Sequence, residues 1–139
     1  MILFQREIEN ANLFAWSTLK NELCGLFKST ELTLSIIEGS YHLGVNDAIC
    51  EVLGSETFLV GSLYCNHSIS YMQLLGVSAK VITKQYSHPK QLVTEALTGF
   101  KKRLKSSIYM MVYTPLRYLN DKENYESQLI IGIQLLDRI

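Results

Sequence analysis

The stretch GSETFLVGSLYCNHSISYMQLLGV, residues 54–77, decides the fold that this sequence predicts. Its apolar and glycine positions predict a buried strand over 57–63, a short helix over 68–75, and a tight turn at Gly76 that ends the helix. The polar positions between the strand and the turn hold Asn66, His67 and Tyr71, and the stretch contains no lysine. The stretch therefore predicts the fold of the chain, but it does not predict a catalytic reaction.

Outward from this stretch, helical and strand patterns alternate along the chain. Apolar steps of three and four residues predict helices, and short apolar runs bounded by polar residues or glycine predict strands. The predicted helices cover residues 8–27, 45–53, 68–75 and 89–104, and the predicted strands cover 32–37, 57–63, 107–113 and 129–135. This alternation is typical of a three-layer α/β/α sandwich with a largely buried mixed sheet. Residues 1–139 are expected to form a single domain, with a long polar loop over 114–127.

The totals of the chain exclude several classes of partner. The chain has 139 residues, of which 47% are hydrophobic, and its 13 basic and 13 acidic residues give a formal net charge of zero. No field of one sign attracts nucleic acid or an anionic membrane, so neither is an expected partner. The basic run over 101–105 is expected to be a solvated helix face.

The cysteines and the first residues point to a reducing compartment. Cys24, Cys50 and Cys65 are too few and too scattered for a disulfide framework, and no pair has zinc-ligand spacing. The first residues lack the basic leader and the apolar segment of a signal peptide, and no apolar run is long enough to span a membrane. We therefore expect a cytoplasmic protein. The apolar residues 1–4 before the first helix add surface that self-association would cover, so a homo-oligomer is expected.

Candidate ligand-binding residues gather where the predicted strands end. In open α/β sheets, ligands bind beyond the carboxyl ends of the strands, which here are residues 38–42, 64–67 and 114–117. The candidates are Glu38, Gly39, Ser40, Tyr41, Asn66, Tyr71, Thr114 and Arg117. Tyrosine rings at these ends could stack on a base while Arg117 or Lys122 meets a phosphate. The expected ligand is therefore a nucleotide-like small molecule.

The order and spacing of these segments resemble the C-terminal domain of the competence/damage-inducible protein CinA, which also exists alone as bacterial nicotinamide mononucleotide deamidase. The segments that carry the resemblance are Leu32-Thr33-Leu34, Glu38, Gly54-Ser55, residues 58–61, residues 74–79 and Gly99. The resemblance runs from the first helix to the last strand. It implies the family's α/β fold and hydrolysis of a carboxamide to the acid and ammonia.

The residues that would perform this chemistry depart from the family's pattern. The family's serine after the first-strand glutamate falls on Gly39, with Ser40 one position later. The family's tyrosine falls on Asn66 and its lysine falls on Tyr71. A hydroxyl nucleophile needs a base beside it, and neither group stands at its position here. Only Glu38 stays in register.

The family's phosphate-binding loop is also replaced. A glycine-rich loop lets backbone N–H groups approach a phosphate closely, but the corresponding residues 114–118 contain no glycine and include Pro115, which has no N–H. We therefore expect this chain to lack nicotinamide mononucleotide deamidase activity and to act by ligand binding or protein association.

An amide hydrolase with a rearranged active site is the alternative hypothesis. Ser40 beside His42 or His67 would pair a hydroxyl with a base, and Glu38 could orient the histidine. The catalytic candidates are Glu38, Ser40, His67 and Tyr71, and no cofactor is expected. No local spacing supports a metal site, whose candidate ligands would be Glu38, His42, Cys65 and His67.

Overall fold

The computed structural model describes residues 2–6, 13–39, 44–85, 88–118 and 125–136. Its centre is a five-stranded mixed sheet with the strand order β1-β7-β4-β2-β3. These strands are β1 (Ile2–Arg6), β2 (Leu34–Gly39), β3 (Leu59–Cys65), β4 (Ile108–Tyr113) and β7 (Leu129–Leu135). Strand β2 is parallel to both β3 and β4, whereas β7 is antiparallel to β4 and β1. The carboxyl ends of β2, β3 and β4 therefore lie at one edge of the sheet.

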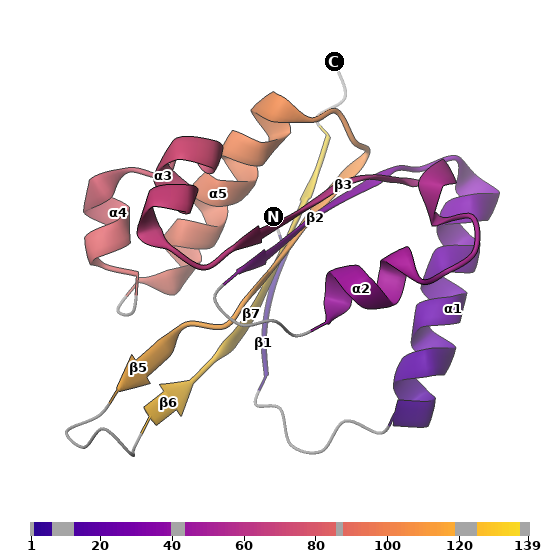
Figure 1. The fold of residues 1–139 in the computed structure, drawn as a ribbon, viewed down its shortest axis with the longest axis horizontal. Coiled ribbons are helices and arrows are strands. Elements are labelled where there is room, and N and C mark those ends of the chain that lie inside the picture. The colour runs from indigo at the N-terminus through magenta and orange to yellow at the C-terminus, as the bar shows by residue number, and fades with distance from the viewer. Residues whose placement is uncertain (1, 7–12, 40–43, 86–87, 119–124, 137–139) are drawn as a thin grey trace.

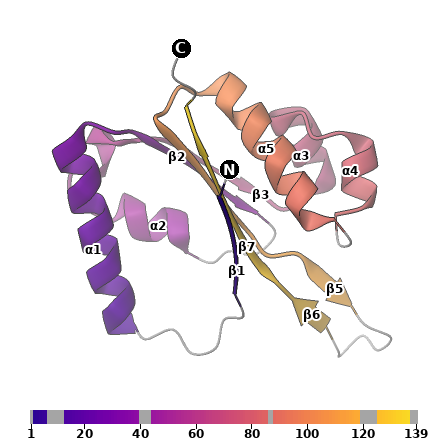
Figure 2. The ribbon, with the colours of Figure 1, turned by 180° about the vertical axis from the view of Figure 1, so that it is seen from behind.

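Helices cover both faces of this sheet (Figures 1 and 2). One face carries α1 (Leu13–Thr30), α2 (Val45–Cys50) and the 3-10 turn η1 (Ser55–Thr57), and the other carries α3 (Ser68–Leu75), α4 (Ala79–Thr83) and α5 (Pro89–Arg103). The predicted three-layer α/β/α architecture with a mixed sheet is confirmed. No helix in the described part of the chain is long and apolar enough to cross a membrane.

The hydrophobic core lies in two clusters, one on each face of the sheet. Between the sheet and α3–α5, the buried side chains include those of Ile37, Tyr71, Leu97 and Met111. Between the sheet and α1–α2, the rings of Phe27 and Phe58 stack with centroids 5.3 Å apart. All six residues of β2 are buried because this strand is central and covered on both faces.

The elements with the clearest local signals match their predictions closely. Helix α3 spans Ser68–Leu75 as predicted, and Gly76 ends it in the left-handed conformation at φ 68°. Strand β7 also has its predicted bounds, and α5 begins at Pro89 and ends one residue earlier than predicted. Periodic apolar spacing together with proline at the start or glycine at the end fixes these boundaries locally.

Several predicted boundaries are wrong by two or more residues. The second predicted helix ends at Cys50 instead of residue 53, and β3 begins at Leu59 because residues 55–57 form the 3-10 turn η1. The first predicted strand, over 32–37, corresponds to β2 and extends to Gly39, so Glu38 and Gly39 lie inside it. Helix α1 begins at Leu13 and continues to Thr30, beyond the predicted end at residue 27. The beginning predicted at residue 8 lies outside the described residues.

Two pairings were not predicted at all. Residues 2–6 form the edge strand β1, and the expected loop over 114–127 contains β5 (Leu116–Tyr118) paired with β6 (Tyr125–Ser127). Strand β1 pairs with residues 129–133, more than a hundred positions away. Such pairing depends on a distant partner, so neither strand has a strong local signal.

Helices α3 and α5 pack closely at Gly99. A Cβ atom at this position would overlap the carbonyl oxygen of Leu75, the last residue of α3. The absence of a side chain therefore lets the two helix backbones approach each other. This contact holds α3, and with it the residues that follow β3, against the long helix α5.

Candidate functional site

The predicted site residues lie where β2, β3 and β4 end. The described residues at these ends are Glu38, Gly39, Asn66, His67 and Thr114, with Tyr71 one turn into α3. Ser40, Tyr41, His42 and Lys122 lie outside the described residues. Arg117 is the central residue of β5, and only this backbone position is described. The structure thus brings together the strand-end part of the predicted set.

The carboxylate of Glu38 caps the beginning of α2. Glu38 is 1% exposed, and its carboxylate oxygens accept hydrogen bonds from the backbone N–H groups of Val45 at 3.4 Å and Asn46 at 3.1 Å. The N-cap residue of α2 is Gly44, which has no side chain to do this. A negative charge at a helix N-terminus is stabilising, so these contacts give Glu38 a structural role.

Tyr71 fills the space beside Gly39. Its side chain is 1% exposed, its hydroxyl donates a hydrogen bond to the carbonyl oxygen of Cys65 at 2.7 Å, and its ring meets that of Tyr113 edge to face. A Cβ atom at Gly39 would lie only 2.5 Å from the Tyr71 hydroxyl oxygen. Real Cβ contacts are longer than this, so residue 39 has no room for a side chain while Tyr71 occupies this position.

The other strand-end residues also make local structural contacts. His67 is the N-cap of α3, and its Nδ1 accepts a hydrogen bond from the backbone N–H of Ile69 at 3.2 Å. The backbone N–H and hydroxyl of Thr114 donate to the carbonyl oxygen of Gly39, at 3.3 and 3.4 Å. Asn66 is exposed beside His67. Their polar groups thus secure the helix start and the ends of β2 and β4.

Two residues of α2 that the sequence analysis did not single out complete this edge. Asp47 accepts a hydrogen bond from the hydroxyl of Tyr64 at 2.9 Å. Asn46 is buried, and its side-chain amide has no hydrogen-bond partner among the described residues. Their position just after the loop that follows β2 was the available signal, because that loop returns the chain to the strand ends.

The contact with Asp47 changes the acidity of Tyr64. Partial burial, followed by the hydrogen bond and the negative charge of Asp47, raises the pKa of Tyr64 to about 12. Each of these effects favours the neutral phenol over the phenolate. We therefore expect Tyr64 to keep its proton up to about pH 11, one unit below that pKa.

An ultraviolet titration tests this expectation. Subtracting the phenolate absorbance of Tyr64→Phe from that of the native protein isolates Tyr64, and the difference should stay flat up to about pH 11. In Asp47→Asn, the same subtraction should show Tyr64 losing its proton nearer its ordinary pKa of about 10. Glu51→Gln, which removes an exposed acid beside α2, is the control and should change little. Ionisation of Tyr64 near its ordinary pKa in the native protein would contradict the assignment.

Metal chemistry finds no support among the described side chains. Cys65 is buried, and burial raises the pKa of its thiol to about 11, which keeps it protonated at neutral pH. Within the described ranges, no group of three or more His, Cys, Asp or Glu side chains gathers where a metal could be held. His42, one of the candidate ligands, lies outside these ranges.

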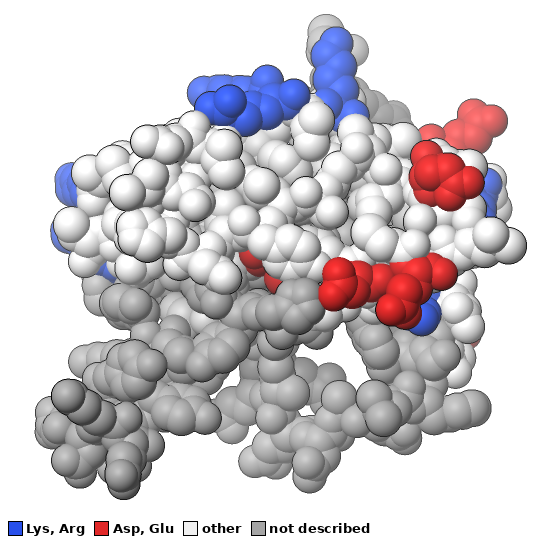
Figure 3. Space-filling view, in the orientation of Figure 1, with Lys and Arg blue, Asp and Glu red and all other residues white. Residues whose placement is uncertain are grey.

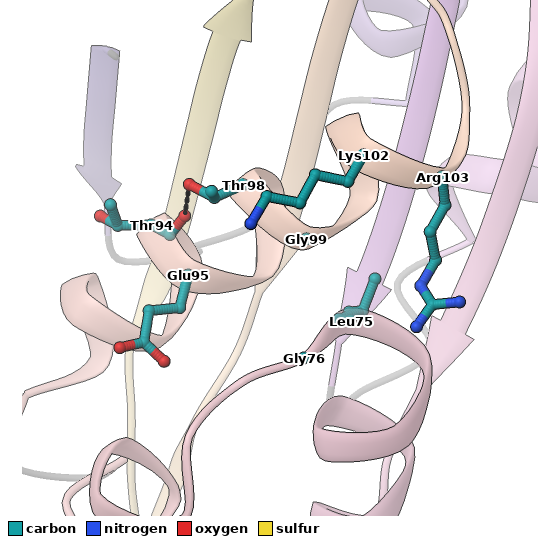
Figure 4. A pocket seen from close by; sticks show the side chains of 8 residues that line it. All are labelled: Leu75, Gly76, Thr94, Glu95, Thr98, Gly99, Lys102 and Arg103. Atoms are coloured by element: carbon teal, nitrogen blue, oxygen red, sulfur yellow. Dashed lines mark hydrogen bonds between the residues drawn. The ribbon is translucent and has the colours of Figure 1, made fainter.

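A separate hollow lies on the outer layer, between α3 and α5. It has a volume of about 460 Å³ and is lined by Leu75, Gly76, Thr94, Glu95, Thr98, Gly99, Lys102 and Arg103. Several of its polar groups already have partners within the protein. Thr98 donates to the carbonyl of Thr94 (Figure 4), and Glu95 accepts from the backbone N–H of Ser78. Arg103 donates to the carbonyl of Gln73. None of the candidate site residues lines this hollow.

Several solved structures have a similar fold. A CinA superfamily protein from Escherichia coli aligns with a TM-score of 0.68 and 13% identity, covering 94% of this chain and 83% of that chain. The competence/damage-inducible protein CihA from Agrobacterium tumefaciens gives a TM-score of 0.68 and 13% identity, with 90% and 84% covered. The chain has a CinA-like fold. A CinA superfamily protein from Klebsiella pneumoniae gives 0.70 and 12%, with 86% and 81% covered.

The CinA-like fold confirms the resemblance inferred from the ordered segments of the sequence. No family model matches the sequence, and no curated protein matches it significantly. At identities of 12–14%, the structural likeness concerns the fold. The chemistry of this CinA-like chain must therefore be argued from its own residues.

Proposed function

We propose that this CinA-like protein does not deamidate nicotinamide mononucleotide and acts instead through binding or association. The observation that carries the proposal is the packing of Tyr71 against Gly39. The serine position of the resembled family holds Gly39, and the Tyr71 hydroxyl lies 2.5 Å from where a side chain there would begin. The space of a nucleophile is thus filled by a buried tyrosine.

The lysine that would act as the base is also missing, because Tyr71 stands at its position. A lysine at position 71 could take a proton from a hydroxyl if its surroundings lowered its pKa. The hydroxyl of Tyr71 instead donates a hydrogen bond to the carbonyl oxygen of Cys65. Lys80 and Lys84 are exposed on and after α4. No described lysine therefore takes the place that Tyr71 occupies.

A rearranged amide hydrolase based on Ser40 and His67 has less support. It would use Glu38 to orient a histidine, but the Glu38 carboxylate accepts two backbone N–H groups of α2. His67 uses Nδ1 to cap α3. Both side chains thus have contacts that account for their presence without catalysis.

Ligand binding without turnover remains part of the proposal. The side-chain amide of Asn46 is buried beside Glu38 and has no partner among the described residues. A buried amide without hydrogen bonds is costly, so a polar small molecule at this edge would be stabilised by it. We expect the protein to work in the cytoplasm, in keeping with its unpaired cysteines Cys24, Cys50 and Cys65.

A single incubation with nicotinamide mononucleotide tests both parts. We expect no ammonia release above the rate without protein, because the position of the family's serine holds Gly39 and that of its lysine holds Tyr71. The melting temperature of the same sample reports binding separately, with Asn46→Leu as the variant that removes the buried amide. Ammonia release that scales with protein concentration would refute the proposal. A raised melting temperature without ammonia would assign the protein to ligand binding, and no change would favour association.

A further inference from the structure

The exposed edge of the sheet at β3 lacks charge and proline, two of the features that usually prevent strand pairing, and has one irregular step near its beginning. Strand β3 is the last strand of the five-stranded sheet, and β2 pairs with only one of its sides. Its seven residues, LVGSLYC, include no charged residue and no proline. Edge strands of soluble proteins usually carry such residues or are covered by another element. No other described strand pairs with β3.

Large apolar side chains are exposed beside this edge on both faces of the sheet, and the exposed Ser62 is polar. Val60 is 44% exposed and Tyr64 is 43% exposed, and on the neighbouring α3 the exposed fractions of Ile69 and Met72 are 53% and 41%. In Figure 1, β3 is the strand nearest the viewer, with α3 in front on the same side. In Figure 3 the described upper part of this face is largely uncharged, with Lys and Arg along its upper and left borders and Asp and Glu toward the right.

We propose that two copies of this chain associate by antiparallel pairing of their β3 strands, forming one continuous ten-stranded sheet across a two-fold axis. The proposal does not depend on whether the protein is an enzyme. A two-fold axis perpendicular to the sheet allows only registers in which residues on the same face lie opposite each other. Full overlap of residues 59–65 then places Ser62 on the axis, opposite Ser62 of the second copy.

The chemistry of this register favours a second copy as the occupant. The small residues Gly61 and Ser62 lie at the centre, so no bulky side chain keeps the strands apart. Val60 lies opposite Tyr64 of the second copy, and a β-branched residue beside an aromatic one is a favourable cross-strand pair. The chain has no net charge, with 13 basic and 13 acidic residues, so two copies do not repel each other.

One step of the strand is irregular. The ladder of β3 with β2 has an irregular step between Leu59 and Gly61, which leaves residues 61–65 as its regular part.

The strand alone is too small for a stable interface, and the flanking helix supplies the rest. Seven extended residues span about 23 Å. The surface that such a strip can bury is far smaller than the roughly 800 Å² that each partner buries in a stable complex. Antiparallel pairing on a common sheet brings the two α3 helices to the same face. Ile69 and Met72, two of the three large apolar side chains that α3 exposes, would then be covered.

Sedimentation of the full chain tests whether the β3 edge forms the dimer interface. We expect a dimer in the micromolar range and, for Val60→Lys, a dissociation constant at least about tenfold higher, because two lysines would be placed at the paired edge. The matched control is Leu135→Lys, which adds the same charge at an exposed position of β7, a strand already paired on both sides. The dissociation constant of the Leu135→Lys dimer should equal that of the native protein. A monomer at all concentrations, or a dimer that tolerates Val60→Lys, overturns the proposal.

Cross-linking tests the register independently of stability. Residues directly opposite in an antiparallel pair have Cα atoms about 4.5–5.5 Å apart, within the range that a disulfide spans. In a Cys50→Ser background, which removes the exposed native cysteine, Ser62→Cys should oxidise to a covalent dimer. Thr83→Cys, exposed at the end of α4, should remain monomeric on a denaturing gel. Equal cross-linking of both variants, or of neither, counts against the proposed pairing.

Discussion

Replacing Gly99 by alanine should destabilise the protein by about 3 kcal/mol and lower its melting temperature by roughly 10 °C. The added Cβ atom would overlap the backbone carbonyl oxygen of Leu75, at the end of α3. Backbone cannot move aside as a flexible side chain can, so α3 and α5 would have to separate. This separation would also loosen the packing of Leu75 and Leu97 in the core between them and the sheet.

The chain offers a matched control in Gly25, which lies in the interior of α1. A Cβ atom there meets nothing within 4 Å. Alanine has a higher helix propensity than glycine, so Gly25→Ala should stabilise the protein by about 0.5–1 kcal/mol. The same substitution should therefore have opposite signs at two helical positions. Urea unfolding of both variants measures the difference, and a loss below about 1 kcal/mol at Gly99 would show that the helices are not held this closely.

The contrast between these glycines also explains what the sequence could predict. Helical periodicity placed both residues on helices, and the order of glycines and apolar runs identified the CinA-like fold. Periodicity describes one element at a time, however, and says nothing about which glycine faces another backbone. That distinction depends on how α3 and α5 cross, which is a property of the assembled layers.

For the candidate site as well, the sequence predicted the positions of residues but not their contacts. The predicted strand ends put Glu38, Gly39 and Thr114 at one edge of the sheet, and the structure has them there. The contacts that give these residues their roles could not be predicted, because they come from other elements. Val45 and Asn46 of α2 meet the Glu38 carboxylate, and Tyr71 of α3 reaches across to Gly39.

Gly39→Ala should cost about 2–3 kcal/mol in the native protein and much less when Tyr71 is replaced by phenylalanine. In the native protein, the new Cβ atom would lie 2.5 Å from the Tyr71 hydroxyl oxygen, which would have to leave its hydrogen bond with Cys65. Tyr71→Phe removes that oxygen. The nearest remaining atoms are then Cδ2 of Tyr113 at 3.1 Å and Cε of Met111 at 3.2 Å, and a methionine end can move by a few tenths of an ångström.

A double-mutant cycle by urea unfolding measures this coupling. Tyr71→Phe alone should cost about 1–2 kcal/mol, because it removes the buried hydrogen bond to Cys65. The double variant should then be more stable than the sum of the single losses predicts, by about 1–2 kcal/mol. Gly61→Ala is the control, because its Cβ would meet the side-chain end of Leu104 and not Tyr71. Its cost should be the same in both backgrounds, and additive losses for Gly39→Ala would refute the coupling.

The same coupling bears on function, because it joins two of the positions at which the chain departs from the resembled deamidases, those of the serine and the lysine. A serine at residue 39 would meet the Tyr71 hydroxyl, so restoring the nucleophile alone should destabilise the protein without restoring activity. A lysine at residue 71 alone would remove the buried tyrosine ring from its contact with Tyr113 and leave an amine beside a glycine. Neither single change gives a hydroxyl with a base beside it. The packing of Tyr71 against Gly39 thus acts as one structural unit, so a serine and a lysine could be introduced here only by changing both residues together, and Asn66 and the loop over 114–118 would still differ from the deamidases.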